Sequence, residues 1–322
     1  MGAMKQLGLG LNLSTKKTRK REFLEEMNRV VPWAALVQIV APHYPKARTG
    51  RPPFGIETML RIHYLQQWFG LSDPAMEEAL HDIPLYREFA KLEGVMARLP
   101  DETTILRFRH LLEKHDLAAD MLRLVNDILQ AKGLLMRTGT VVDATLISAP
   151  SSTKNAEGER DPEMKQTRKG NNWYFGMKAH IGVDAASGLV HTVVCTSANV
   201  NDLNVAGQLL HGQERVAYGD AGYQGVHKRP EAEGPEWNVA MRPGKRRQLN
   251  PFIQPQFLAE QVEQLKASVR AKVEHPFRVI KRQFGMTKVR YRGLKKNTAQ
   301  VVTLFALSNL WMARHALMGA RG

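Results

Sequence analysis

The spacing of apolar residues changes its period near residue 135, and this change limits the folds that the chain can adopt. From residue 22 to about residue 132, apolar side chains recur at the three- and four-residue intervals of helices. After that point come short apolar runs such as GTVVDATLI (139–147), rich in Val, Thr and Ile, which are typical of buried strands. We therefore expect an all-helical part followed by an α/β part.

The two parts can be divided further into expected elements. Helices are expected over residues 22–31, 56–70, 73–92 and 101–133 of the first part. The helix pair between residues 60 and 80 fits a helix-turn-helix and a plain αα-hairpin equally well, and both remain open. The basic residues at the start of the chain lack periodicity, so we expect an arm over 1–22, a helical domain over 23–134 and an α/β domain over 135–322.

In the second part, the pattern predicts strands joined by turns and helices. The expected strands cover 139–147, 177–183, 189–197, 215–222 and 237–241, with a hairpin turn at DAASG (184–188). A short helix is expected over 202–212, a long one over 257–284 and a last one over 298–317. The polar segment 151–172 shows no periodicity and predicts an exposed loop.

The charge of the chain predicts a polyanionic partner. The 322 residues carry a formal net charge of +15, which favours binding to nucleic acid or to an anionic membrane surface. Between Arg242 and Lys296 there are fifteen Lys and Arg against three Glu, a net of +12. The most apolar stretch, 301–317, is interrupted by polar residues and is too short to span a bilayer, so we expect no membrane partner. A single cysteine excludes an intrachain disulfide and a cysteine-based zinc site, and the histidines have no ligand-like spacing.

Three carboxylates stand out from their surroundings. Asp143 lies inside the apolar run VVDATL, where an isolated charge would be costly without a partner. Asp220 ends another apolar run between glycines, and Glu274 is the one acid in the basic segment RAKVEHPFRVIKRQFG (270–285). Such oxygens could bind two divalent cations for phosphoryl transfer. Each acid alone is also explained as a cap, a turn residue or a salt-bridge partner, and physical reasoning by itself leaves that choice open.

Several segments together resemble bacterial insertion-sequence transposases of the DDE class, and are most similar to the insertion-sequence-5 family. They are VVDATL, WYFGMKAHIGVD, VAYGDAGY and VRAKVEHPFRVIKRQFG, followed by KVRYRGL and NLW. The family signature places Tyr, Arg, Glu and Lys at fixed spacing. Arg270, Glu274 and Lys281 match it in register, while Ala267 replaces the tyrosine.

The resemblance implies an α/β catalytic domain with an RNase H-like mixed sheet and flanking helices, preceded by the helical DNA-binding domain. It implies Asp143, Asp220 and Glu274 as catalytic metal ligands for two Mg²⁺ ions, for which Mn²⁺ would substitute. The implied activity is binding to the terminal inverted repeats, cleavage at the element ends and joining of the 3′-OH to target DNA. The alternatives are a catalytically idle DNA-binding derivative and an RNase H-like nuclease that only cleaves.

The expected partner is double-stranded DNA, at the element ends and at the target, bound by a homodimer or a higher oligomer in the bacterial cytoplasm with the nucleoid. The expected DNA-binding residues are Arg107, Arg109, Lys178, Lys245, Arg246, Arg247, Arg270, Arg278, Lys281 and Arg282.

Overall fold

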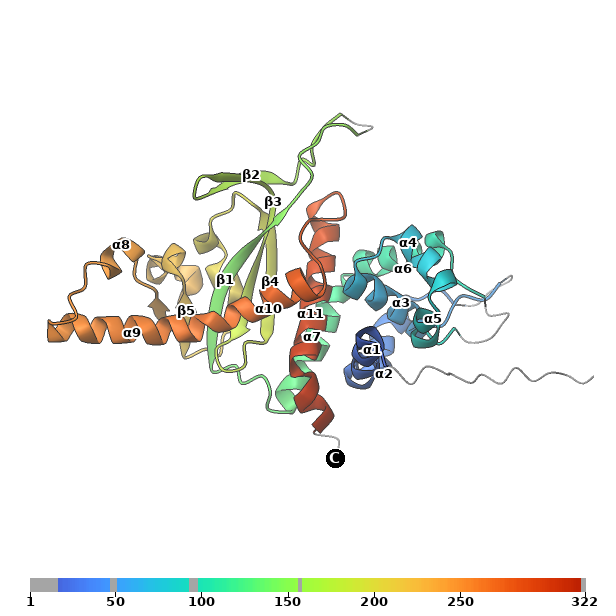
Figure 1. The fold of residues 1–322 in the computed structure, drawn as a ribbon, viewed down its shortest axis with the longest axis horizontal. Helices are drawn as coiled ribbons and strands as arrows, with labels where there is room; N and C mark the ends of the chain where they lie inside the picture. Colours follow the sequence, from blue (N-terminus) through green and yellow to red (C-terminus); the bar gives the residue numbers. More distant parts are fainter. Residues whose placement is uncertain (1–16, 47–50, 93–97, 156–157, 320–322) are drawn as a thin grey trace, which may run out of the picture.

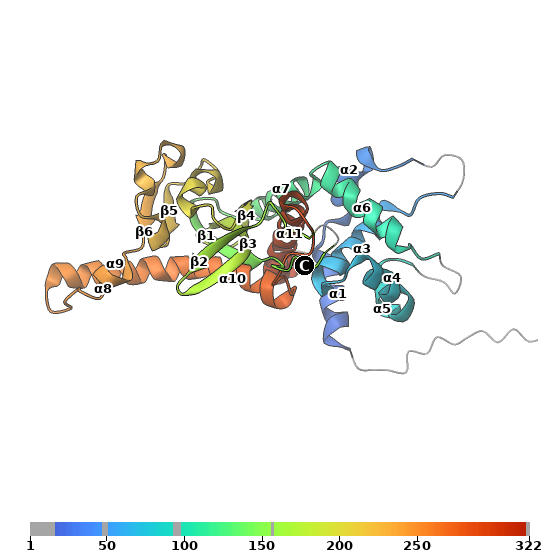
Figure 2. The same ribbon diagram turned by 90° about the horizontal axis from the view of Figure 1, so that it is seen from above.

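The computed structural model describes residues 17–46, 51–92, 98–155 and 158–319. A helical part and a mixed β-sheet lie side by side, with helices α7 (Leu117–Ala131) and α11 (Leu294–Gly319) between them (Figure 1). Figure 2 shows the same order from above. Helix α9 (Gln254–Arg270) runs beside the sheet and projects beyond it, away from the helical part.

The helical part contains shorter helices than the sequence predicted. Its elements are α1 (Arg19–Val30), α2 (Trp33–Val40), α3 (Ile56–Phe69), α4 (Asp73–Asp82), α5 (Pro84–Phe89), α6 (Glu102–Lys114) and α7. The expected helix over 101–133 is divided because Asp116 has a left-handed backbone with φ of 52°. Helix α1 begins at Arg19, capped by the Thr18 hydroxyl, so it starts within the segment expected to be an arm. Residues 1–16 of that arm lie outside the described residues.

The sheet has the mixed order expected of an RNase H-like domain. Its strands are β1 (Gly139–Ser148), β2 (Lys165–Lys169), β3 (Asn172–Asp184), β4 (Val190–Ser197), β5 (Val216–Gly219) and β6 (Glu236–Val239). They lie in the order β2-β3-β1-β5-β6, and β4 also pairs with β3. The β1–β3 and β3–β4 pairs are antiparallel, whereas β1–β5 and β5–β6 are parallel. The predicted α/β fold class is thus confirmed.

Two segments before the last helices differ from expectation. Strand β2 lies inside the segment expected to be an exposed loop, and it pairs with the start of β3 along its whole length. The expected helix over 202–212 is instead two 3₁₀ turns, Asp202–Asn204 and Ala206–Leu209. The predicted hairpin turn is present, and the Asp184 carboxylate accepts hydrogen bonds from the backbone N–H groups of Ala186 and Ser187.

The single helix expected over 257–284 is wrong, because this segment is built from four pieces. They are α9, a 3₁₀ turn at Ala271–Val273, α10 (Glu274–Arg278) and a π-helical turn at Val279–Gln283. Pro276 has no backbone N–H to donate to the carbonyl group of Lys272, so a regular α-helical ladder cannot cross this point. A short helix, α8 (Pro243–Arg246), precedes α9.

The larger of two hydrophobic clusters in the described residues includes residues of both the helical part and the sheet, and a smaller one lies around Val142 and Tyr223. Helix α11 joins the helical part to the sheet, because it packs against α1, α7 and β4. Its Asn309 side chain bonds to the backbone of Val190, and its Arg314 pairs with Glu26 at 2.9 Å. By length and composition α11 could cross a membrane, but 67% of its most apolar window is buried within the protein, as in the core helix that we expected.

Candidate active site

Asp143 lies on β1, and Asp220 immediately follows the end of the neighbouring strand β5. The parallel pairing of β1 with β5 sets Gly139 opposite Val216 and Val141 opposite Tyr218. The same offset, continued for two residues, places Asp143 level with Asp220 where β5 ends. Adjacent strands lie about 4.8 Å apart, and side chains alternate in the same sense on both, so the two carboxylates belong to the same face and the same edge.

Asp143 is held in surroundings that disfavour its charge. The side chain is partly buried in the middle of β1, and one carboxylate oxygen accepts a hydrogen bond of 2.7 Å from the backbone N–H of Ala144. Burial is the main cause that raises its pKa to about 6; the nearby Asp220 carboxylate adds to the rise, and the Arg270 guanidinium opposes it. A second positive charge beside Asp143 would therefore be favourable.

Asp220 is presented by a tight turn. Its Oδ1 accepts a hydrogen bond of 2.8 Å from the backbone N–H of Gly222, in the 3₁₀ turn that follows the strand. A side chain at Gly219 would place its Cβ 2.9 Å from the Cβ of Tyr223. A glycine is therefore needed immediately before Asp220, which explains the first glycine of the segment GDAG (219–222).

Glu274 begins α10 with an exposed side chain. Within the described residues its carboxylate takes part in no hydrogen bond or ion pair, despite the basic residues on either side of it in the sequence. The 3₁₀ turn immediately before it packs against β1, the strand of Asp143. The alternative explanation, that Glu274 is only a salt-bridge partner, is therefore supported by no contact within the described residues.

Lys281, from the π-helical turn, reaches the same strand. Its Nζ donates to Oγ1 of Thr145 at 2.6 Å and to the carbonyl oxygen of Leu146 at 3.1 Å. Thr145 follows Asp143 by two residues and so shares its face of β1. Burial lowers the pKa of Lys281, and the nearby Lys169 lowers it further. Arg270 thus places positive charge near Asp143, and Lys281 is a second cation bonded to the same strand.

The three acids fit a divalent cation site by their chemistry. All are oxygen donors, the type that Mg²⁺ prefers. Asp143 and Asp220 each use one oxygen to accept a backbone hydrogen bond, and no salt bridge engages either of them within the described residues. Together with the raised pKa of Asp143, the unused oxygens are consistent with ligands for a cation.

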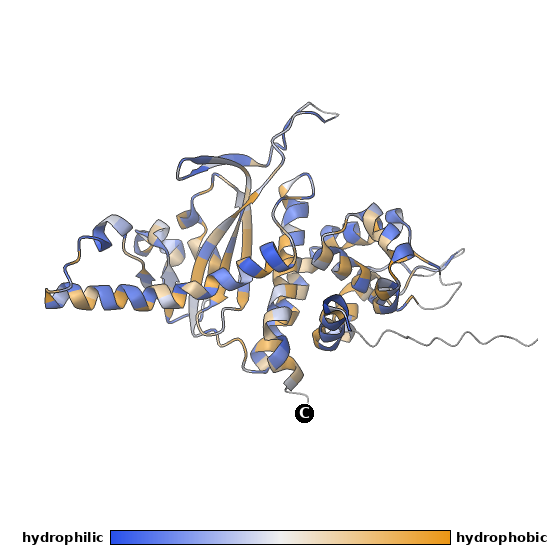
Figure 3. Ribbon diagram, in the orientation of Figure 1, coloured by the Kyte–Doolittle hydropathy of each residue, from blue (hydrophilic) through white to orange (hydrophobic). Residues whose placement is uncertain are grey.

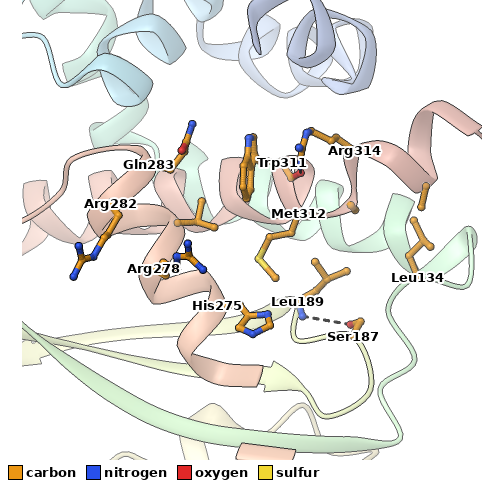
Figure 4. Close-up of a pocket in the computed structure, with 13 residues that line it drawn as sticks. Leu134, Ser187, Leu189, His275, Arg278, Arg282, Gln283, Trp311, Met312 and Arg314 are labelled. Atoms are coloured by element: carbon orange, nitrogen blue, oxygen red, sulfur yellow. Dashed lines mark hydrogen bonds between the residues drawn. The ribbon is translucent and has the colours of Figure 1, made fainter. Parts of the chain in front are cut away.

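Arg278 and Arg282 line a pocket next to α10. The pocket has a volume of about 670 Å³ and lies between the α10 segment and α11. Figure 4 shows His275, Arg278 and Arg282 on one wall and Trp311 and Met312 on the other. The change from 3₁₀ to α to π geometry rotates these side chains relative to one another, and π-turns are frequent at functional sites.

The remaining expected DNA contacts divide into exposed and internal residues. Arg107, Lys245 and Arg247 are exposed. Arg246 instead makes a two-bond ion pair with Glu260, at 3.0 and 2.6 Å.

Arg109 and Lys178 are engaged inside the protein. Arg109 is buried and bonds to Asp73 and Glu113, both at 2.8 Å. Lys178 donates to Asp202 at 2.9 Å and to a backbone carbonyl group. Neither side chain is free to reach DNA, so neither belongs to the DNA interface proposed below.

The β2–β3 hairpin carries basic residues that sequence reasoning missed, next to two aromatic residues. Lys165, Arg168 and Lys169 lie on β2, and Trp173, opposite Arg168 on β3, is 67% exposed. The hairpin projects beyond the rest of the sheet (Figure 1). The stretch KQTRKGNNWY holds the signal, because it combines three cations with two aromatic residues, but no apolar alternation marks it as a strand.

A second group of possible metal ligands lies near the opposite ends of β1 and β5. Ligand atoms of His191, His211 and Glu214 lie within 4.8 Å of one another. The Glu214 carboxylate already accepts hydrogen bonds from Thr140 and from the backbone of this turn. The histidine spacing gave no sign of this group, because the fold brings residues from different loops together.

Comparison with known families agrees with the architecture. Residues 135–310 match the family model described as transposase DDE domain, and residues 11–111 match the model described as transposase domain (DUF772). No solved structure is a significant match to the chain. The first match covers the whole sheet and most of the helices packed on it, and it includes the strands that bring Asp143 and Asp220 into register. The chain therefore belongs to the DDE transposases and is an insertion-sequence transposase.

Proposed function

We propose that the protein is a magnesium-dependent transposase of the insertion-sequence-5 type. It binds the terminal inverted repeats of its own element, cleaves at the element ends and joins the 3′-OH to target DNA. The observation that carries the proposal is the register of β1 and β5, which aligns Asp143 with Asp220. The supporting observation is a Glu274 carboxylate that has no partner within the described residues.

In this proposal Asp143, Asp220 and Glu274 would hold the metal ions. Two bound divalent ions would provide an activated oxygen nucleophile and stabilise charge on the phosphate. The chain itself supplies rigid positions, because Asp143 lies on a paired strand and Asp220 is fixed by a backbone hydrogen bond. Such positioning accounts for most of catalysis in phosphoryl transfer.

The basic residues near the acids would hold the DNA backbone. Arg270 and Lys281 lie close to Asp143, as shown by the effect of Arg270 on the Asp143 pKa and by the Lys281–Thr145 bond. Arg278 and Arg282 would extend this surface along the pocket beside α11. The exposed residues Lys245 and Arg247 would each add a contact to the DNA backbone, and so would the β2–β3 hairpin.

The helical domain over residues 23–134 would recognise the element ends, with residues 135–322 as the catalytic domain and residues 1–22 as an accessory basic arm. A cleft of about 360 Å³ in the helical part supports this assignment, because four cationic residues line it. They are Lys46, Arg51, Arg98 and Arg107. Such a protein would act on the chromosome, so we place it in the bacterial cytoplasm with the nucleoid.

The decisive experiment incubates the full chain with a plasmid carrying candidate element ends, with Mg²⁺ or with EDTA. Cleavage and joined products are read on a gel, and binding to the same ends is measured by gel shift. The proposal requires both product types with Mg²⁺ and neither in EDTA. Cleavage without joining would indicate the nuclease, and binding without cleavage would indicate the idle derivative.

The matched variants are Glu274→Gln and Glu233→Gln, which make the same chemical change inside and outside the site. Glu233 lies exposed in a turn before β6. Glu274→Gln should bind the ends normally and lose cleavage by several orders of magnitude, while Glu233→Gln behaves as the native chain. Normal cleavage by Glu274→Gln would mean that the third ligand is another residue.

A further inference from the structure

Helix α9 and the turn before it carry most of the exposed apolar side chains of the described residues. The described residues contain eight exposed large hydrophobic side chains, and six of them lie between Phe252 and Leu265. They are Phe252 (95% exposed), Ile253 (45%), Phe257 (44%), Leu258 (56%), Val262 (48%) and Leu265 (68%). Figure 3 shows hydrophobic segments alternating with hydrophilic ones along α9, which projects from the sheet.

The helix is inverted relative to an ordinary surface helix, because its charged side faces the protein. Glu263 is buried and accepts a hydrogen bond of 2.8 Å from the backbone N–H of Met241. Lys266 donates to Glu263 and to the carbonyl oxygen of Val239. A helix that satisfies its polar residues inside and leaves its apolar residues outside is expected to bury that outer face against a partner.

The apolar residues follow the spacing of a helix-pairing seam. Leu258, Val262, Leu265 and Val269 are separated by four, three and four residues, which is the heptad pattern of coiled coils. Val269, at the inner end, packs against the hydrophobic core, so the seam extends outward from the core toward Leu258. A seam of this kind accepts a second helix with the same pattern.

The charge of α9 argues against DNA and against a membrane as the occupant. The helix contains two glutamates, one lysine and one arginine, so its formal charge is zero within a segment of +12. The seam is flanked by Ala259, Gln261, Lys266 and Ser268. An anionic surface would select cations there, whereas the single lysine is already bonded to Glu263. A second copy of this helix would bring no unpaired like charges into contact.

The exposed area is sufficient for a stable pair. Given the surface of side chains of this size, the six exposed fractions correspond to roughly 500–700 Å² per copy. Complete burial of all six side chains in two copies would remove up to about 1,000–1,400 Å², which reaches the range of specific protein interfaces. We propose that α9 of one chain packs against α9 of a second chain, and that Leu258, Val262 and Leu265 form the centre of the dimer interface. This inference rests on exposure, spacing and charge and does not depend on the proposed catalytic activity.

The test is the molar mass of the nuclease-treated full chain by sedimentation velocity, over a range of micromolar concentrations and in salt high enough to suppress DNA binding. The native chain should sediment at twice the 36.3 kDa chain mass. Leu258→Glu/Leu265→Glu should sediment at 36.3 kDa, with its dissociation constant weakened at least about a hundredfold. The matched control, Gln261→Glu/Gln264→Glu, adds the same charge to exposed positions beside the seam and should remain dimeric.

Thermal unfolding of the three proteins, followed by circular dichroism in the monomeric concentration range, checks that all are folded. No loss of fold is expected, because the two leucines are 56% and 68% exposed. A native chain that remains monomeric throughout would overturn the proposal. So would a Leu258→Glu/Leu265→Glu variant that keeps the native mass, or a control that dissociates equally.

Discussion

Lys281 is bonded to the strand that carries Asp143. Its Nζ lies 2.6 Å from Oγ1 of Thr145, and the second bond, to the carbonyl oxygen of Leu146, fixes its direction. The lysine comes from a π-helical turn 136 residues away in sequence. The side chain is therefore placed before DNA arrives, at a fixed position relative to the acids.

Loss of the Lys281 charge should slow cleavage without abolishing it. We expect Lys281→Ala to reduce single-turnover cleavage roughly 10²-fold, because one preorganised positive group is lost while the carboxylates remain. Thr145→Val keeps the charge and removes one acceptor, so its effect should be much smaller. Equal losses in both variants would show that the contact with Thr145, and not the charge, is what matters.

Replacement of Asp143 should make the metal-free protein more stable. The raised pKa, about 6 against an ordinary 3.8, means that the folded state disfavours the ionised carboxylate. This penalty is absent below pH 3.8, grows as pH rises and is complete above about pH 6. Each pKa unit is worth about 1.4 kcal/mol, so Asp143→Asn should gain up to about 3 kcal/mol at pH 7.5 and almost nothing at pH 4. Urea unfolding in EDTA measures the difference.

The same two proteins provide a test of metal binding. Added Mg²⁺ should raise the unfolding midpoint of the native chain, because a ligand that binds the folded state stabilises it. It should raise that of Asp143→Asn much less. Equal shifts in the two proteins would place the bound ion elsewhere, for example at the group formed by His191, His211 and Glu214.

Neighbouring basic residues on and after α8 should differ in their contribution to DNA binding. Lys245 and Arg247 are exposed, whereas Arg246 is paired with Glu260. Each phosphate contact that is lost should lower the slope of log affinity against log salt by about 0.9. Lys245→Ala/Arg247→Ala should therefore flatten the slope, and Arg246→Ala should change it little. A larger change from Arg246→Ala would mean that DNA displaces Glu260.

Two arginines on α6 should have opposite phenotypes. Arg109 is buried between Asp73 and Glu113, so Arg109→Met leaves two acids without their cation and should cost about 3–5 kcal/mol of stability. Arg107→Met, on the exposed side, should change stability by less than about 0.5 kcal/mol. Gel shifts below the unfolding temperature should show weaker DNA binding for Arg107→Met alone.

The order of elements could be predicted from the sequence because it depends on local patterns. The change of period near residue 135 gave the two parts, and the turn at 184–188 gave the hairpin. Asp184 explains why that turn was easy to predict: its carboxylate binds the backbone of the turn itself, and also the N–H groups of Met136 and Arg137.

Other features depend on distant contacts and could not be predicted in this way. Strand β2 is polar throughout, and only its pairing with β3 makes it a strand. Arg107 and Arg109 cannot be distinguished by the sequence pattern, but Arg109 is buried and pairs with Asp73 on another helix. At the candidate site, the sequence marked Asp143 by its apolar surroundings, while the choice of Asp220 and Glu274 needed the family resemblance. The register of β1 with β5 is a property of the folded sheet.

Helix α11 has a consequence for how the protein is made. It contacts α1 near the start of the chain, and its Asn309 is bonded to β4 and to Asn126 of α7. During synthesis the N-terminal helices and the sheet emerge first, but the surfaces that α11 covers stay open until α11 itself has emerged. A ribosome that stops before residue 294 would therefore yield a chain with an exposed core, a substrate for chaperones and proteases. The complete core forms only after α11 has left the ribosome.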